Sequence, residues 1–200
     1  MTRKTLVRTA LAVLTAGAVL AGCSNGGHDM SGMGAGSSSS ATAQQGDHNQ
    51  ADVTFVQQMI PHHQQAVGMA ELVPGHTTNP EVIELAQRIQ KAQAPEIAQM
   101  TAWLTKWGAA VPTSMPGMDH GSSMPGMMSP AEMAQLEQAE DAEFDRLWLD
   151  MMIKHHQGAI DMAKTELSAG RNADVKKLAQ QIIDAQQAEI NEMHALLPQS

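Results

Sequence analysis

The sequence contains an internal repeat with a period of 93 residues. Residues 52–104 align with residues 145–197 without a gap, and 22 of the 53 aligned positions are identical. Chance gives only a few identities over such a length, so the alignment indicates a duplication. Both copies carry a His-His-Gln triplet, at residues 62–64 and 155–157. The chain is therefore expected to fold one structural unit twice and to pack the two units together.

Each copy has the local signals of two helices. We expect Asp52 to cap the first helix, and Asn79 and Asn172 to cap the second helix of each copy. Ser129 begins a capping box that predicts an additional helix before the second copy. Apolar side chains recur in each copy at helical spacing, and neither hairpin can bury such a face alone. The sequence therefore predicts an all-α fold, a four-helix bundle built from two duplicated helical hairpins.

The N-terminal residues are typical of an export signal. A basic start precedes a short apolar run, which is too short to span a bilayer as a permanent helix. The run ends in Leu-Ala-Gly-Cys at residues 20–23, which resembles the lipobox of bacterial lipoproteins. That resemblance implies cleavage after residue 22, acylation of Cys23, and a protein that is lipid-anchored at the extracytoplasmic face of the cell membrane.

Composition divides the rest of the chain. Residues 23–51 are rich in glycine, serine, alanine and glutamine, which predicts a flexible tether. We expect a first hairpin at 52–107, a Met/His-rich linker at 108–129, and a lead-in helix with the second hairpin at 130–198, with residues 52–198 forming one domain. From Cys23 on, 21 acidic side chains stand against nine basic ones, which disfavours nucleic acid as a partner.

Methionine and histidine are unusually frequent, with 16 and nine residues, whereas there is a single cysteine. Thioethers and imidazoles without thiolates suit copper, above all Cu(I), and other transition metals stay open. The candidate ligands lie along one helix of each copy: Met59, His62, His63, Met69, Met152, His155, His156 and Met162. On or beside the core face of the second helices are polar residues that could orient the imidazoles, namely Gln93, Glu96, Gln186 and Glu189. The alternative is that these methionines fill the core and that the histidines are hydrogen-bonded structural residues.

The linker carries further soft donors in a segment where packing gives no reason for methionine. Two Met-Pro-Gly-Met units flank an Asp-His pair, and the auxiliary candidate ligands are Met115, Met118, His120, Met124, Met127 and Met128. These units resemble the methionine motifs of extracytoplasmic copper-handling proteins. A low-complexity spacer is the alternative interpretation. If the units bind metal, the linker could capture an ion and pass it on.

The paired motifs resemble the signatures of the domain of unknown function 305 family. The likeness covers residues 52–197 and rests on Phe55 to Ala70 in the first copy and on Asp145 to Ala163 in the second. The resemblance implies a ferritin-like helical bundle that is usually exported, with some members that bind copper and are linked to copper tolerance. It also assigns the eight His and Met residues of the two copies as the ligands.

These observations predict an extracytoplasmic, lipid-anchored protein that binds or buffers copper, with the membrane, the metal ion and a metal-transfer protein as partners. A ferritin-like redox metalloenzyme is a second possibility, but the chain has no Glu-x-x-His motif and no other catalytic motif that we recognise. We therefore expect no enzymatic activity. A third possibility is an envelope adaptor that binds other proteins through its methionines.

Overall fold

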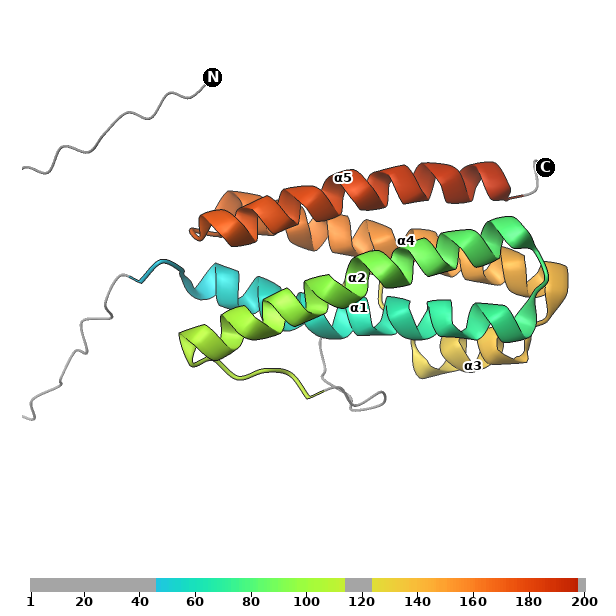
Figure 1. The fold of residues 1–200 in the computed structure, drawn as a ribbon, viewed down its shortest axis with the longest axis horizontal. Coiled ribbons are helices and arrows are strands. Elements are labelled where there is room, and N and C mark those ends of the chain that lie inside the picture. The colour runs from blue at the N-terminus through green and yellow to red at the C-terminus, as the bar shows by residue number, and fades with distance from the viewer. Residues whose placement is uncertain (1–45, 114–123, 198–200) are drawn as a thin grey trace, which may run out of the picture. The chain divides into compact units, whose positions relative to one another are not determined.

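The computed structural model of the chain describes residues 46–113 and 124–197, and they form five helices and no strand. The helices are α1 (Gln50–His76), α2 (Pro80–Trp107), α3 (Pro130–Gln138), α4 (Asp141–Ala169) and α5 (Ala173–Leu196) (Figure 1). The predicted all-α fold is confirmed, and the packing of the long helices is that of a bundle. The origin of the two hairpins by duplication, their likeness to ferritin and the expected domain boundaries stay predictions.

Most helix ends follow the local signals of the sequence. Asn79 and Asn172 cap α2 and α5, and Ser129 forms a capping box with Glu132 at the start of α3. The expectation for Asp52 is wrong, because α1 begins earlier and is capped by Asn49. Asp52 is the third helical residue, and its carboxylate accepts a hydrogen bond from the Asn49 backbone in a second capping box.

Two aspartates tie the hairpins to each other. The buried Asp52 on α1 accepts hydrogen bonds from the backbone N–H groups of Arg171 and Asn172, at the turn between α4 and α5. Asp145 on α4 accepts one from the Asn79 side chain, at the turn between α1 and α2. The first helix of each hairpin therefore anchors the turn of the other hairpin.

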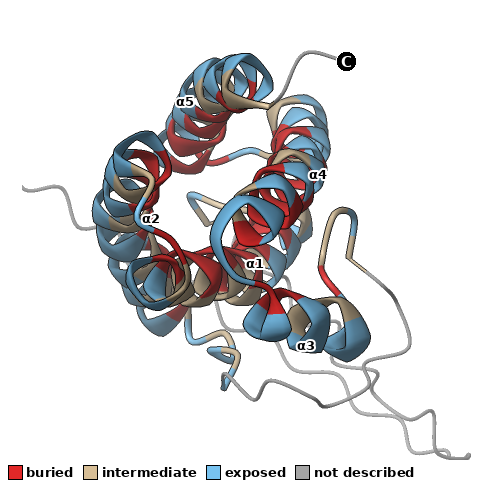
Figure 2. Ribbon diagram, turned by 90° about the vertical axis from the view of Figure 1, so that its right-hand side faces the viewer, coloured by how far each residue is buried: buried red, intermediate tan, exposed pale blue. Residues whose placement is uncertain are grey.

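The buried faces of the long helices point inward (Figure 2). Helix α1 packs along α2, α4 packs along α5, and α1 also packs against α4. We call this last contact the α1/α4 seam; its buried side chains include Met59, His62, Ala66, Met69, Trp148, Met152, His155, Ala159 and Met162. The indole N–H of Trp148 donates to the backbone oxygen of Met69 across the seam, at 3.0 Å.

Helix α3 lies outside the four long helices, on the side of α1 and α4 (Figure 2). Its Leu136 is fully buried in a core cluster that contains Phe144 of α4. Glu132 accepts a hydrogen bond from Lys154 of α4 at 2.8 Å. The lead-in to the second copy is thus a separate short helix, which ends two residues before α4 begins. Among the residues that the structure describes, no helix combines the length and apolar character needed to cross a membrane.

Candidate metal centre

Four histidines are fully buried near the middle of α1 and α4. They are His62 and His63 on α1 and His155 and His156 on α4. Neighbouring residues of a helix point about 100° apart, so the two histidines of each pair face different partners. The rings of His62 and His155 meet across the seam, with centroids 3.7 Å apart and planes inclined by 37°. The other two histidines face the second helix of their own hairpin.

Each of those outer histidines is hydrogen-bonded to a glutamate. His63 Nε2 lies 2.7 Å from Glu96 Oε2 on α2, and His156 Nε2 lies 2.7 Å from Glu189 Oε2 on α5. A carboxylate accepts, so the ring N–H of each histidine is at Nε2. Nδ1 of both rings is buried and has no hydrogen-bond partner. Helix periodicity places His63 at the edge of the core face, and in the structure its side chain is fully buried.

The two histidines of the seam differ from each other. His62 Nε2 donates to the backbone oxygen of Pro125 at 3.0 Å, and its Nδ1 has no partner. Neither ring nitrogen of His155 has a partner. Three of the four rings therefore commit Nε2 to an oxygen and leave Nδ1 open, and the fourth leaves both nitrogens open.

Burial keeps the seam histidines neutral. Removal from water lowers the pKa of His62 to about 3, and the proximity of His63 contributes in the same direction. Burial, together with the neighbouring His62, also lowers the pKa of His155 well below its ordinary value of 6.5. A neutral imidazole is the form that binds metal ions, because its unprotonated nitrogen has a free lone pair.

The candidate methionines lie on both sides of the seam histidines. Met59 and Met162 belong to one core cluster, and Met69 and Met152 belong to the other. Each cluster thus contains candidate thioethers from both α1 and α4, and therefore from both hairpins. All four side chains are buried, with at most 7% of their surface exposed.

The other predicted polar residues divide into two groups. Glu96 and Glu189 contact imidazoles, as described, whereas Gln93 and Gln186 are buried and form no hydrogen bond to them. The side-chain nitrogen and oxygen of Gln93 and the side-chain oxygen of Gln186 have no hydrogen-bond partner. Within residues 46–113 and 124–197, no three His, Cys, Asp or Glu side chains form a group suited to a metal ion.

The linker ligands are only partly within the described residues. Met124 and Met127 are half-buried and Met128 is buried in the core, so the expectation that packing gives no reason for methionine in the linker is wrong for Met128. The remaining auxiliary candidates and the predicted lipidation residue lie outside the described residues; they are Met115, Met118, His120 and Cys23.

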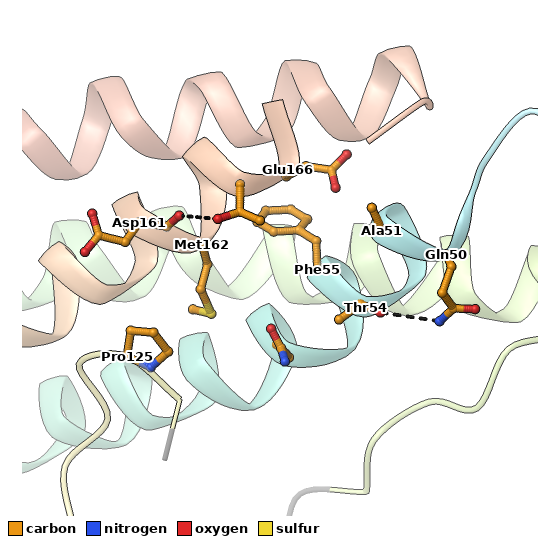
Figure 3. Close-up of a pocket in the computed structure, with 10 residues that line it drawn as sticks. Gln50, Ala51, Thr54, Phe55, Pro125, Asp161, Met162 and Glu166 are labelled. Carbon is orange, nitrogen blue, oxygen red and sulfur yellow. Dashed lines mark hydrogen bonds between the residues drawn. The ribbon is translucent and has the colours of Figure 1, made fainter. Parts of the chain in front are cut away.

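Sequence reasoning missed a second buried polar feature of the seam. Glu166 of α4 is 1% exposed, and its carboxyl group lies beside that of Asp52 on α1. Burial raises the pKa of Glu166 to about 8, and the nearby Asp52 adds to the effect. The aligned position of the first copy is Val73, so the repeat gave no signal for it. Glu166 lines a groove of about 440 Å³ between α1 and α4, with Pro125 at one end and Gln50 at the other (Figure 3).

Comparison with known families gives one match over most of the chain. The model of the domain of unknown function family DUF305 matches residues 52–197. An uncharacterized protein of Acanthamoeba polyphaga mimivirus is 43% identical over 53 residues, and the match spans 26% of this chain and 35% of that protein.

Solved structures of DUF305 proteins resemble the chain over most of its length. A DUF305 protein from Streptomyces coelicolor, named as a candidate secreted protein, is 36% identical, covers 74% of this chain and 91% of its own, and superposes with a TM-score of 0.66. A DUF305 fragment from Deinococcus radiodurans is 34% identical over 74% of this chain and 95% of its own, with a TM-score of 0.67.

A third similar structure is that of CopM in a Cu(II)-bound form. It is 36% identical to this chain over 72% of its length and 94% of the length of CopM, with a TM-score of 0.63. CopM has also been solved in Cu(I)-bound and silver-bound forms.

Proposed function

This chain belongs to the DUF305 family, and from that membership and the donors of the α1/α4 seam we propose that it is a copper-binding protein. Its cargo is Cu(I), its role is copper buffering or tolerance outside the cytoplasm, and it acts without catalysing a reaction. The eight proposed ligands are the His-His pairs of α1 and α4 with Met59, Met69, Met152 and Met162.

The observation that carries the proposal is the set of open ring nitrogens. In His62, His63 and His156 the Nε2–H donates to an oxygen and Nδ1 is left without a partner inside the protein. Metal-binding histidines commonly donate their other ring N–H to a carboxylate or a backbone carbonyl, which orients the ring and raises its basicity. The contacts with Glu96 and Glu189 have that form.

The thioethers favour Cu(I) over harder ions. A soft sulfur donor prefers a soft cation, and each core cluster contains at least one methionine from α1 and one from α4. CopM has Cu(I)-bound and silver-bound forms, which agrees with binding of soft monovalent ions, and it also has a Cu(II)-bound form. A thioether is uncharged at any pH, so sulfur ligation would persist where imidazoles are protonated.

The proposal extends to the location and partners of the protein. The lipobox-like sequence before Cys23 supports an anchor of acyl chains at the outer face of the cell membrane. Metabolic labelling with a radioactive fatty acid should mark the wild-type chain and leave the Cys23→Ser variant unlabelled. Equal labelling of the two chains would refute the anchor.

Competitive titration with a chromogenic Cu(I) chelator tests the binding of the metal. The purified chain, kept under reductant, should retain Cu(I) through dialysis. Met59→Leu should weaken the affinity by about tenfold or more, since it removes a ligand and conserves volume. Met100→Leu is the matched control, because Met100 is fully buried in the same core cluster but is not a proposed ligand.

Two results would contradict the proposal. One is a wild-type chain that retains no copper after dialysis. The other is an equal loss of affinity in Met59→Leu and Met100→Leu, which would mean that the variants act through packing alone. If the chain instead binds an envelope protein in the presence of a chelator, the adaptor interpretation takes its place.

A further inference from the structure

The end of the linker is fitted closely onto α4. We call residues 124–128 the docked segment. Gly126 has a φ of +79°, and a Cβ there would lie 2.6 Å from the backbone oxygen of Lys154. A Cβ on Gly158 of α4 would lie 2.0 Å from the backbone oxygen of Pro125. Both glycines are therefore required for the backbone of the segment to approach the backbone of the helix so closely.

The other end of the docked segment is held by α1. Gln65 donates from Nε2 to the backbone oxygen of Met128 and accepts from the Met128 N–H at Oε1, at 2.9 and 2.7 Å. The Met128 side chain is 4% exposed and belongs to a core cluster. The segment thus bridges α1 and α4, with two hydrogen bonds to the Gln65 side chain on α1 and a glycine contact on α4.

This bridge places one backbone carbonyl on one of the two seam histidines. Pro125 O accepts the hydrogen bond of His62 Nε2, whereas His155 has no such partner. The aligned positions of the two repeats differ at this very place, since Gln65 corresponds to Gly158. The linker occurs once in the chain, so it can serve only one of the two histidines.

We propose that Pro125 is a positioning residue of the metal centre: its carbonyl fixes His62 as the Nε2–H tautomer, which leaves Nδ1 as the ligand atom and makes His62 and His155 inequivalent. The tautomer part stands on the hydrogen bond between His62 and Pro125, and the ligand part rests on the proposed function. The carbonyl acts on His62 as Glu96 acts on His63, with backbone in place of a carboxylate. Losing such a partner commonly reduces metal affinity by about 10- to 100-fold.

Gly158→Ala tests the proposal with a matched control. Alanine suits a helix, but its Cβ would displace Pro125 O. Gly68→Ala makes the same change on α1, where a Cβ would meet nothing within 4 Å. Long-range ¹H–¹⁵N NMR of the metal-free chains reports which ring nitrogen of His62 carries the proton. We expect the Nε2–H form in the wild type and in Gly68→Ala, and a mixture of tautomers in Gly158→Ala.

Gln65→Ala releases the docked segment without a clash and serves if Gly158→Ala does not fold. It should also mix the tautomers of His62. In the same chains, Cu(I) titration should show an affinity lowered by about tenfold in the released variants and unchanged in Gly68→Ala.

Three results would overturn the proposal. They are a wild-type His62 without a preferred tautomer, a His62 tautomer that persists in both released variants, and a tautomer that changes without any change in Cu(I) affinity. If the wild-type chain binds no copper but its tautomer responds as expected, the proposed function fails and the assignment of Pro125 to His62 holds.

Discussion

Replacing His155 with leucine should make the metal-free protein more stable, and the gain should grow in acid. Both ring nitrogens of His155 are buried without a partner, and burying an unsatisfied polar group costs about 1–3 kcal/mol. Leucine has a similar volume and no polar atom. At pH 7 we therefore expect the free energy of unfolding of His155→Leu to exceed that of the wild type by about 1–3 kcal/mol.

The acid dependence follows from the pKa of the buried ring. Burial lowers the pKa of His155 well below 6.5, so below pH 6.5 the unfolded chain takes up a proton that the folded chain does not. His155 protonation therefore has no effect on the free energy of unfolding above pH 6.5 and lowers it as the pH falls below that value. At pH 5 the loss amounts to about 2 kcal/mol for one such histidine. His62, with a pKa of about 3, adds a similar loss, which the His155→Leu variant keeps.

Urea unfolding at pH 7 and pH 5, in the presence of a chelator, measures these differences. The advantage of His155→Leu over the wild type should be larger at pH 5 by about 2 kcal/mol. His194→Leu is the control; its side chain is exposed, so it should change the free energy of unfolding by less than about 0.5 kcal/mol. A His155→Leu protein that is less stable than the wild type, with the same pH dependence, would refute the reasoning.

Three other substitutions have defined outcomes. The pKa of Glu166 is raised from 4.5 to about 8, so the free energy of unfolding of the wild type falls as the pH rises from 4.5 to 8. Urea unfolding of Glu166→Gln should lack this fall, so its free energy of unfolding relative to the wild type should rise by more than about 1 kcal/mol between pH 5 and pH 9. The same pH dependence in both proteins would contradict this expectation. Trp148→Phe loses the hydrogen bond to Met69 O and some buried volume, so thermal unfolding should show a loss of about 1–3 kcal/mol. Leu136→Ala should lower the free energy of unfolding by about 2–4 kcal/mol and should accelerate hydrogen exchange in α3 more than in α5. Equal acceleration in the two helices would contradict separate docking of α3.

The sequence allowed the helices to be predicted better than their ends. Asn79, Ser129 and Asn172 act as the expected caps, because a cap depends on residues within one turn of it. Asp52 misled the prediction, because an acidic residue serves equally well as a cap or as the third residue of a capping box. Its carboxylate also binds the turn before α5, a contact between distant residues that local signals do not contain.

The candidate ligands were identifiable from the sequence, but their grouping was not. Helical spacing places Met59, His62 and Met69 on one side of α1, but it does not say which residues of the second copy lie opposite them. The structure brings the rings of His62 and His155 together and places Met59 and Met162 in one core cluster, because α1 and α4 pack against each other. The contact of Pro125 with His62 depends on how the linker returns to the bundle, which no helical pattern predicts.

The unpartnered ring nitrogens of the candidate metal centre destabilise the folded chain, and packing does not offset this effect. Five ring nitrogens of the four buried histidines have no partner, and native proteins are stable by only about 5–15 kcal/mol in total. Each unsatisfied group lowers the free energy of unfolding by about 1–3 kcal/mol, so together these atoms lower it by an amount that is large relative to the total. Leucine at the same positions would have no such effect. A ligand that binds only the folded chain raises its free energy of unfolding, and the increase grows with the logarithm of the ratio of the ligand concentration to the dissociation constant. Because the rings of His62 and His155 come together only when α1 and α4 are packed, copper should bind the folded chain far more tightly than the unfolded one. Copper binding and folding are therefore expected to be coupled.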